Sequence, residues 1–99
     1  MQRSDILQKL KSSLPYMASE YRLKKIGIFG SYARDAQNNQ SDIDIVAEFD
    51  LPIGLKFIEF TEYLEDILGK KIDVLTPAGI EGIRNKKIAQ KIRDTVIYA

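Results

Sequence analysis

The chain has 99 residues, and its 15 basic and 14 acidic residues leave a formal net charge of only +1. This balance provides no broad positive field, so we expect no direct binding of nucleic acid. Because the sequence contains no cysteine and no histidine, it excludes disulfides, thiolate nucleophiles, imidazole bases and the usual zinc sites.

The first predicted element is a helix close to the N-terminus. Ser4 is a candidate N-cap, apolar residues follow at helical spacing, and Pro15 indicates a bend or the end of the helix. The apolar residues are Ile6, Leu7, Leu10 and Leu14. We expect this helix to pack on a sheet.

A short apolar strand, residues 25–29, leads into Gly30 and Ser31. Such a strand is typically buried, and the turn that follows it needs a residue without a Cβ. Ser31 is expected to open a helix, whose free N–H groups and partial positive charge suit a phosphate. The hydroxyl of Ser31 adds a donor, although a Gly-Ser pair alone is also typical of an ordinary turn.

The strand predicted over residues 41–49 carries two acids on one face. Alternation places Asp42 and Asp44 opposite the core-facing residues Ile43, Ile45 and Ala47. Carboxylates two positions apart lie about 6.5–7 Å apart at Cα, and they repel each other unless a cation neutralises them. Oxygen ligands of this kind favour Mg²⁺ or Mn²⁺. The alternative is a polar, solvent-facing side of an amphipathic strand.

A second helix is predicted from about Leu55 to Leu68, after the chain breaks at Pro52 and Gly54, with Gly69 as its C-cap. Its apolar surface is wider than one contact face requires. The core stripe comprises Phe57, Phe60, Leu64, Ile67 and Leu68, and Leu55, Ile58 and Tyr63 extend it. Either a thick core or a partner interface explains this width.

A third strand is predicted over residues 71–75 and supplies another acid. Ile72 and Val74 would point into the core, which sends Asp73 to the face of Asp42 and Asp44 if the strands are neighbours. Asp73 then completes a triad of carboxylates suited to two metal ions. The alternative for Asp73 is a surface acid paired with a lysine.

The C-terminal part is predicted as a basic helix from about Ile80 to Arg93, followed by an apolar tail, residues 96–98, that is either a strand or a docking segment. The basic residues are Arg84, Lys86, Lys87, Lys91 and Arg93. They form either a solvated helix face or a binding surface. Lys70 and Lys71 are further candidates for a triphosphate contact, and the sequence does not choose between them.

The motifs resemble a known signature when they are taken together. Gly30-Ser31, ten intervening residues, Asp42-Ile43-Asp44 and Asp73 on a later strand closely resemble the pattern of the DNA polymerase β-type nucleotidyltransferase superfamily. The whole chain is similar to its minimal nucleotidyltransferase (MNT) domain proteins, whose motifs Gly-Ser-Xaa-Ala-Arg and Ser-Asp-Ile-Asp it shares. Asp35 stands where members often have glycine, so the sequence does not predict the conformation of the loop 35–40.

The resemblance implies an α/β (α+β) fold, a small mixed β-sheet packed by helices, as a single domain over residues 1–99. It also implies dependence on ATP and Mg²⁺, with two ions, for which Mn²⁺ can substitute. The candidate site residues are Asp42, Asp44 and Asp73 as catalytic metal ligands, and Gly30, Ser31 and Arg34 as phosphate ligands. For Arg34, capping of the helix is the alternative to a phosphate contact.

The activity implied by this resemblance is transfer of AMP from ATP to a hydroxyl, a tyrosine in some members, of a HEPN-type toxin partner. The chain would then be the antitoxin of a toxin-antitoxin pair, and 99 residues leave no room for a domain that recognises a small molecule, tRNA or DNA. Two alternatives stay open: an inactive antitoxin that neutralises its partner by binding, and a subunit of a small-molecule nucleotidyltransferase.

The expected location follows from the absence of recognisable targeting segments. The sequence shows no signal peptide and no apolar run long enough to span a bilayer. We therefore expect no membrane association and a cytoplasmic location, where ATP is available. The oligomeric state is left open between a homo-oligomer and a hetero-oligomer.

Overall fold

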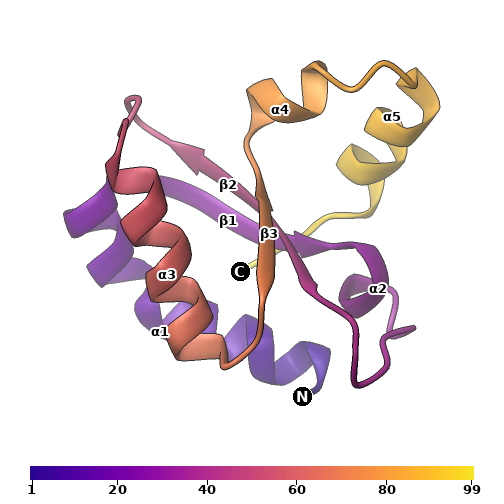
Figure 1. Ribbon diagram of the computed structural model, residues 1–99, viewed down its shortest axis with the longest axis horizontal. Helices are drawn as coiled ribbons and strands as arrows, with labels where there is room; N and C mark the ends of the chain where they lie inside the picture. The colour runs from indigo at the N-terminus through magenta and orange to yellow at the C-terminus, as the bar shows by residue number, and fades with distance from the viewer.

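The computed structural model describes all 99 residues, which form a four-stranded mixed sheet with helices on both faces (Figure 1). The elements are α1 (Arg3–Tyr21), β1 (Leu23–Phe29), α2 (Gly30–Ala33), β2 (Ile43–Phe49), α3 (Lys56–Leu68), β3 (Ile72–Leu75), α4 (Pro77–Glu81), α5 (Lys86–Thr95) and β4 (Ile97–Tyr98). The strand order is β3-β2-β1-β4, with β2 and β3 parallel and β1 antiparallel to both of its neighbours. The predicted α/β (α+β) class is confirmed.

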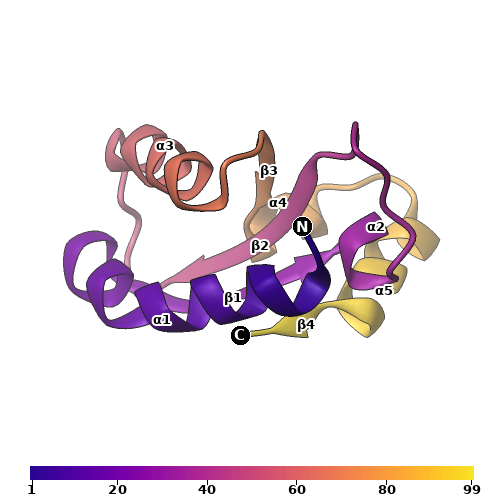
Figure 2. The same ribbon diagram turned by 90° about the horizontal axis from the view of Figure 1, so that it is seen from below.

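The main core lies between the sheet and the helices α1 and α3, and it contains 16 buried residues. Alternation along β2 sends Ile43, Ile45 and Ala47 into this core, as the sequence predicts. Burial of each large aliphatic side chain contributes about 1.5–3 kcal/mol. Figure 2 shows α1 running along the sheet beneath β1 and β2. These contacts hold the sheet in place, and they therefore also fix the positions of the residues on its opposite face.

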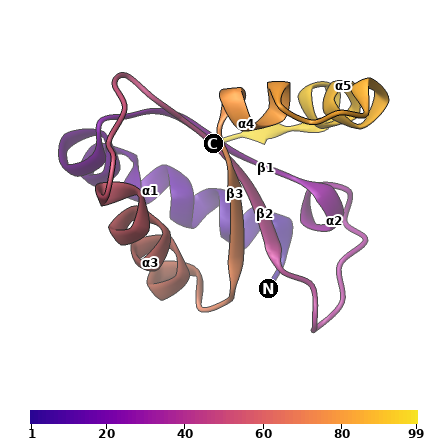
Figure 3. The same ribbon diagram turned by 45° about the horizontal axis from the view of Figure 1, so that its top comes forward.

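The opposite face carries α4 and α5 (Figure 3). Val46 of β2 packs there with Ile80 of α4 and Ala89 of α5 in a second, smaller core cluster. The residues of β2 that alternate with the main core therefore face these two helices. By the same alternation, Asp44 near the start of β2 lies on the face that carries these two helices.

The helix α1 differs from its prediction at both ends. Its N-cap is Gln2 and not Ser4, because the backbone N–H of Gln2 donates to Oδ2 of Asp5 at 2.9 Å in a capping box. Pro15 does not end the helix, which continues to Tyr21. A proline within a helix costs about 3 kcal/mol, and burial of Met17 and Tyr21 beyond it offsets that cost.

The predicted C-terminal helix is two helices in the structure. Thr76 caps α4 by accepting a hydrogen bond from the N–H of Gly79 at 3.2 Å, and Asn85 caps α5 by accepting from Lys87 and Ile88. A second N-cap inside the segment therefore divides it. Of the two interpretations of the tail, the strand is correct, because β4 pairs with β1.

The prediction of α3 is confirmed, and Gly69 ends this helix in the left-handed conformation, with φ of 69°. Tyr63 packs against the main core, whereas Leu55 is 86% exposed and Ile58 is 59% exposed. The wide apolar surface is thus partly a thick core and partly open to solvent. No helix of the molecule has both the length and the apolar character needed to cross a bilayer.

Candidate functional site

The turn from β1 into α2 brings the backbone of Gly30 against a carboxylate of β2. Pairing of β1 with β2 ends at Phe29, which lies opposite Asp44. Gly30 has φ of +70°, and a Cβ at this position would overlap Oδ2 of Asp44. The turn therefore requires glycine for two reasons, its left-handed backbone and the close approach of Asp44. The helix α2 begins at Gly30, one residue earlier than predicted, and Ser31 lies half-buried in its first turn.

The acids Asp44 and Asp73 are direct neighbours across two parallel strands. Asp44 pairs with Asp73 in the register of β2 and β3, and each follows a residue buried in the main core, Ile43 and Ile72. Neighbouring strands lie about 4.8 Å apart. Both carboxylates thus leave the same face of the sheet, and Asp42 immediately precedes β2 on that face. The structure brings all three acids to one end of the sheet.

Negative charge is crowded around Asp44. Burial raises the pKa of the Asp44 carboxyl, and repulsion from Asp73 and Asp42 raises it further, while Arg34 lowers it in part. None of the three carboxylates forms an ion pair within 4.0 Å, since the ion pairs of the molecule join Arg3 to Asp35, Lys24 to Glu48 and Lys56 to Glu20. Their carboxylate oxygens also accept no hydrogen bond, since the carboxylates that do so in this molecule belong to Asp5, Glu20, Glu65 and Asp94. A cluster of carboxylates with this much mutual repulsion favours the binding of a cation.

The donor set fits a divalent metal ion by its chemistry. The three acids offer only carboxylate oxygens, the ligands that Mg²⁺ and Mn²⁺ prefer, and their charges are not balanced by the protein. The acids interact across the two strands, but no three acidic side chains are already gathered as a ready-made metal site. Asp42 and Asp73 are exposed, so their side chains are free to rotate toward Asp44 as a cation binds.

The backbone of the loop after α2 explains how the chain has Asp35 where minimal nucleotidyltransferase proteins often have glycine. Asp35 has φ of 59°, the left-handed region that a glycine adopts at least cost, and aspartate is among the residues that tolerate it. An ion pair at 4.0 Å joins Asp35 to Arg3 of α1. Further along the loop, the N–H of Asn38 donates to Oγ of Ser41 at 3.0 Å. Asp35 thus adopts a glycine-like backbone conformation, and the loop 35–40 does not require glycine at this position.

A pocket of about 230 Å³ adjoins Gly30 on the side of α5. Gly30 and Arg34 line it together with Lys91 of α5, a residue that the sequence left within a general basic set. Arg34 is the C-cap residue of α2, and its positive charge lowers the pKa of Asp44 in part. Sequence reasoning missed the closeness of α5 to the Gly-Ser turn, because the register of that helix was not predictable across the break at Gly82.

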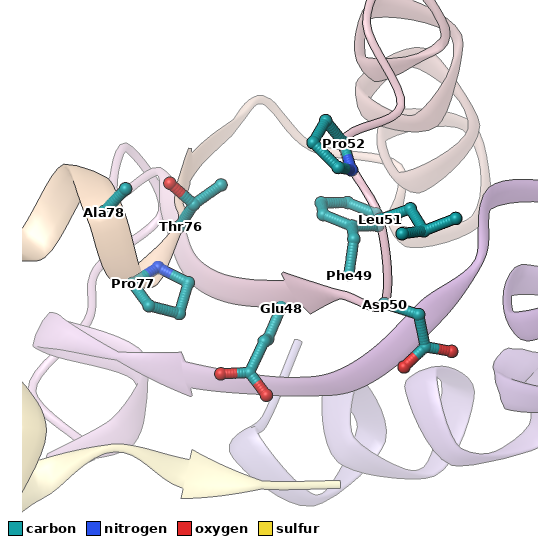
Figure 4. Close-up of a pocket in the computed structure, with 8 residues that line it drawn as sticks. All are labelled: Glu48, Phe49, Asp50, Leu51, Pro52, Thr76, Pro77 and Ala78. Carbon is teal, nitrogen blue, oxygen red and sulfur yellow. The ribbon is translucent and has the colours of Figure 1, made fainter.

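A larger hollow, of about 480 Å³, lies elsewhere (Figure 4). It is lined by Glu48, Phe49, Asp50, Leu51, Pro52, Thr76, Pro77 and Ala78. These residues lie at or just beyond the ends of β2 and β3, whereas Asp44 and Asp73 lie near the beginnings of these strands. At a rise of about 3.3 Å per residue, Asp44 is about 13–17 Å away along the strand. This hollow is therefore separate from the acids.

The chain is similar in sequence to known proteins over nearly its whole length. The nucleotidyltransferase domain family matches residues 6–98. The "Putative protein adenylyltransferase MJ0128" of Methanocaldococcus jannaschii is 44% identical over 95 residues, which cover 95% of this chain and 91% of that protein. The "Protein adenylyltransferase MntA" of Thermococcus cleftensis is 35% identical over 97 residues, 93% of this chain and 94% of that protein.

Solved structures share the fold at lower sequence identity. A structure described as a "putative minimal nucleotidyltransferase" superposes with a TM-score of 0.76 at 20% identity, covering 98% of this chain and 95% of the other. A toxin-antitoxin complex crystallised with AMP-PNP contains a chain that matches with a TM-score of 0.62 at 21% identity, covering 99% of this chain and 72% of that one. The sheet and helices described above are therefore the minimal nucleotidyltransferase fold.

Proposed function

The chain belongs to the nucleotidyltransferase domain family, and we propose that it transfers AMP from ATP to a tyrosine hydroxyl of a partner toxin. The observation that carries this proposal is the pairing of Asp44 with Asp73 beside Gly30. Asp42 precedes β2 at the same end of the sheet, so three acids without ion-pair partners lie near the Gly-Ser turn. The relatives named as protein adenylyltransferases span nearly the whole chain, which supports a protein acceptor.

The partner in this proposal is a HEPN-type toxin, and the chain is its antitoxin. The support is the resemblance of the Gly-Ser and Asp-Ile-Asp motifs to MNT proteins, together with the shared fold of a chain crystallised in a toxin-antitoxin complex. Residues 1–99 would act as one domain, since one core of 16 residues joins α1, α3 and the sheet. A cytoplasmic location, where ATP is available, is part of the proposal.

The acids would hold the metal and the reacting groups. Mg²⁺ bound by Asp42, Asp44 and Asp73 would neutralise the triphosphate and increase the acidity of the acceptor hydroxyl. Gly30 lets the backbone approach the terminal phosphates, and the N–H and hydroxyl of Ser31 donate to them. Because the chain has no histidine, a carboxylate is the suitable base at this end of the sheet.

In the proposed transfer of AMP, one bond to phosphorus forms as another breaks. The acceptor oxygen forms a bond to the α-phosphorus of ATP while the bond from that phosphorus to the bridging oxygen breaks, and pyrophosphate leaves with the electron pair. Asp73 accepts the proton of the hydroxyl. The product is an AMP ester of the tyrosine. Positioning and charge neutralisation supply most of the acceleration in such a reaction.

The test combines the purified chain with Mg²⁺, ATP labelled at the α-phosphate, and the protein encoded beside its gene. We expect label on the partner, with AMP on a tyrosine by tandem mass spectrometry, and no label when Asp44→Asn or Asp73→Asn replaces the wild type. Asp66→Asn, an exposed acid of α3, is the matched control and should label fully. A tightly bound but unlabelled partner would instead identify an inactive binding antitoxin.

A further inference from the structure

The pocket beside Gly30 is shared between two elements that are far apart in sequence. The turn after β1 contributes Phe29, Gly30 and Arg34, and α5 contributes Ile88, Lys91, Ile92 and Thr95. The residues from α5 recur at spacings of three and four, so they occupy one face of the helix. Because the carboxylate of Asp44 lies against Gly30, this pocket adjoins the acidic end of the sheet.

The charges that line the pocket are both positive. Arg34 and Lys91 are its only charged residues, and neither belongs to an ion pair. The side-chain hydrogen bonds donated by arginine and lysine in this molecule come from Arg3, Lys9, Lys56 and Lys70. The hydroxyl of Thr95 is already used, since it donates to the carbonyl oxygen of Lys91 at 2.6 Å. Two unpartnered cations around one cavity suit a polyanion.

We propose that Lys91 of α5 is a further ligand of the β- and γ-phosphates of ATP, beside the Gly-Ser turn and Arg34. This inference rests on the proposed function, because it extends the same nucleotide from the acids, past Gly30, to α5. The α-phosphate would lie beside Asp44 and Asp73, and the terminal phosphates would lie between Arg34 and Lys91. As pyrophosphate leaves, the negative charge on its oxygens grows, and both cations stabilise it.

The structure also selects Lys91 from the other basic residues of the C-terminal segment. Arg84, Lys86, Lys87 and Arg93 do not line the pocket. Arg93 follows Lys91 by two positions and therefore faces a different side of α5. Ile88 and Ile92 supply apolar walls on the face of Lys91, and such walls strengthen a charge interaction by excluding water.

The experiment measures binding by calorimetry for wild type and Lys91→Ala, with Mg²⁺-ATP, inorganic tripolyphosphate and AMP as ligands. Loss of one charge-assisted hydrogen bond should weaken ATP and tripolyphosphate by about 10- to 100-fold. AMP lacks the terminal phosphates, so its affinity should change by less than about twofold. Lys91→Arg keeps the charge and should keep most of the affinity. Lys91 is exposed, so thermal unfolding should show both variants folded.

Lys87→Ala is the matched control, because it removes the same charge from the same helix outside the pocket. It should leave the affinity for all three ligands unchanged. An equal loss in Lys87→Ala would indicate a general field and overturn the assignment, and so would an equal loss of AMP binding. Unaltered tripolyphosphate binding by Lys91→Ala would contradict this inference alone. Failure of the wild type to bind ATP would contradict the proposed function as well.

Discussion

Asp44 lies between the backbone of Gly30 on one side and Asp73 on the other. Burial and the neighbouring acids raise its pKa above the ordinary value of a carboxyl. The folded chain therefore holds the Asp44 proton more tightly than the unfolded chain does. Ionisation of Asp44 consequently reduces stability at neutral pH, and this loss disappears as the pH falls below the raised pKa.

Asp44→Asn should abolish AMP transfer while leaving the metal-free protein at least as stable as the wild type at pH 7. Asparagine keeps the size of the side chain but removes the charge that burial and Asp73 oppose. The difference in melting temperature should shrink as the pH falls through the raised pKa of Asp44, because the wild-type carboxyl then becomes protonated and loses its charge. Thermal unfolding in EDTA between pH 4 and 8 measures this, and a large loss of stability at pH 7 would contradict it.

Gly30→Ala should both destabilise the fold and remove activity. The left-handed backbone costs an alanine about 1–2 kcal/mol, and the new Cβ would displace the carboxylate of Asp44. Gly69→Ala is the matched control, since Gly69 has nearly the same φ, +69°, but open space around it. Urea unfolding should show a loss in both variants, larger at Gly30, and transfer assays should show activity in Gly69→Ala only.

At the scale of elements, the β2 and β3 strands were predictable because their apolar residues alternate. That pattern places Asp42 and Asp44 on one face, and it places Asp73 on the same face if β2 and β3 are neighbours. The register that sets Asp44 opposite Asp73 was not predictable, because strand pairing depends on contacts distant in sequence. Helix ends were less predictable: packing of Tyr21 carries α1 past Pro15.

Contacts distant in sequence also explain why the sequence does not place α5 beside the Gly-Ser turn. The sequence shows the basic residues of α5. However, the N-cap at Asn85 determines where α5 begins, and therefore which face of the helix Lys91 occupies. Helix capping by a short polar side chain competes with continuation of the preceding helix. The sequence alone does not show which of the two prevails.

Asn85→Ala should therefore weaken both the fold and the binding of ATP. The Asn85 side chain accepts hydrogen bonds from the N–H groups of Lys87 and Ile88 at 3.0 and 3.3 Å, and loss of such a cap costs about 1 kcal/mol. Fraying of α5 would displace Lys91. Asn85→Asp keeps the acceptor and should keep both properties. Urea unfolding and ATP titration test this, and full ATP affinity in Asn85→Ala would contradict the link.

At the scale of the whole molecule, the acids and the pocket beside α5 lie at one end of the sheet, and the hollow of Figure 4 lies at the other. The helices α1 and α3 cover the remaining face. The nucleotide of the proposed function would therefore bind at the acidic end, away from the main core. Such binding should stabilise the folded chain by mass action.

Mg²⁺-ATP should raise the melting temperature of the wild-type chain. A ligand at 100 times its dissociation constant adds about 2.7 kcal/mol, which for a domain of this size corresponds to about 10–20 °C. Asp44→Asn should lose most of this shift, because the metal ligand is removed. Differential scanning fluorimetry measures the shift, and its absence at millimolar ATP in the wild type would count against nucleotide binding.

The length of the short connection between α3 and β3, residues 69–71, sets which residue of β3 lies opposite Asp44. Inserting or deleting a single residue there would slide β3 by one position, turning Asp73 inward and Ile72 toward solvent. The chain could remain folded while its chemistry stopped. Active descendants of this sequence should therefore preserve the spacing from Gly69 to Asp73.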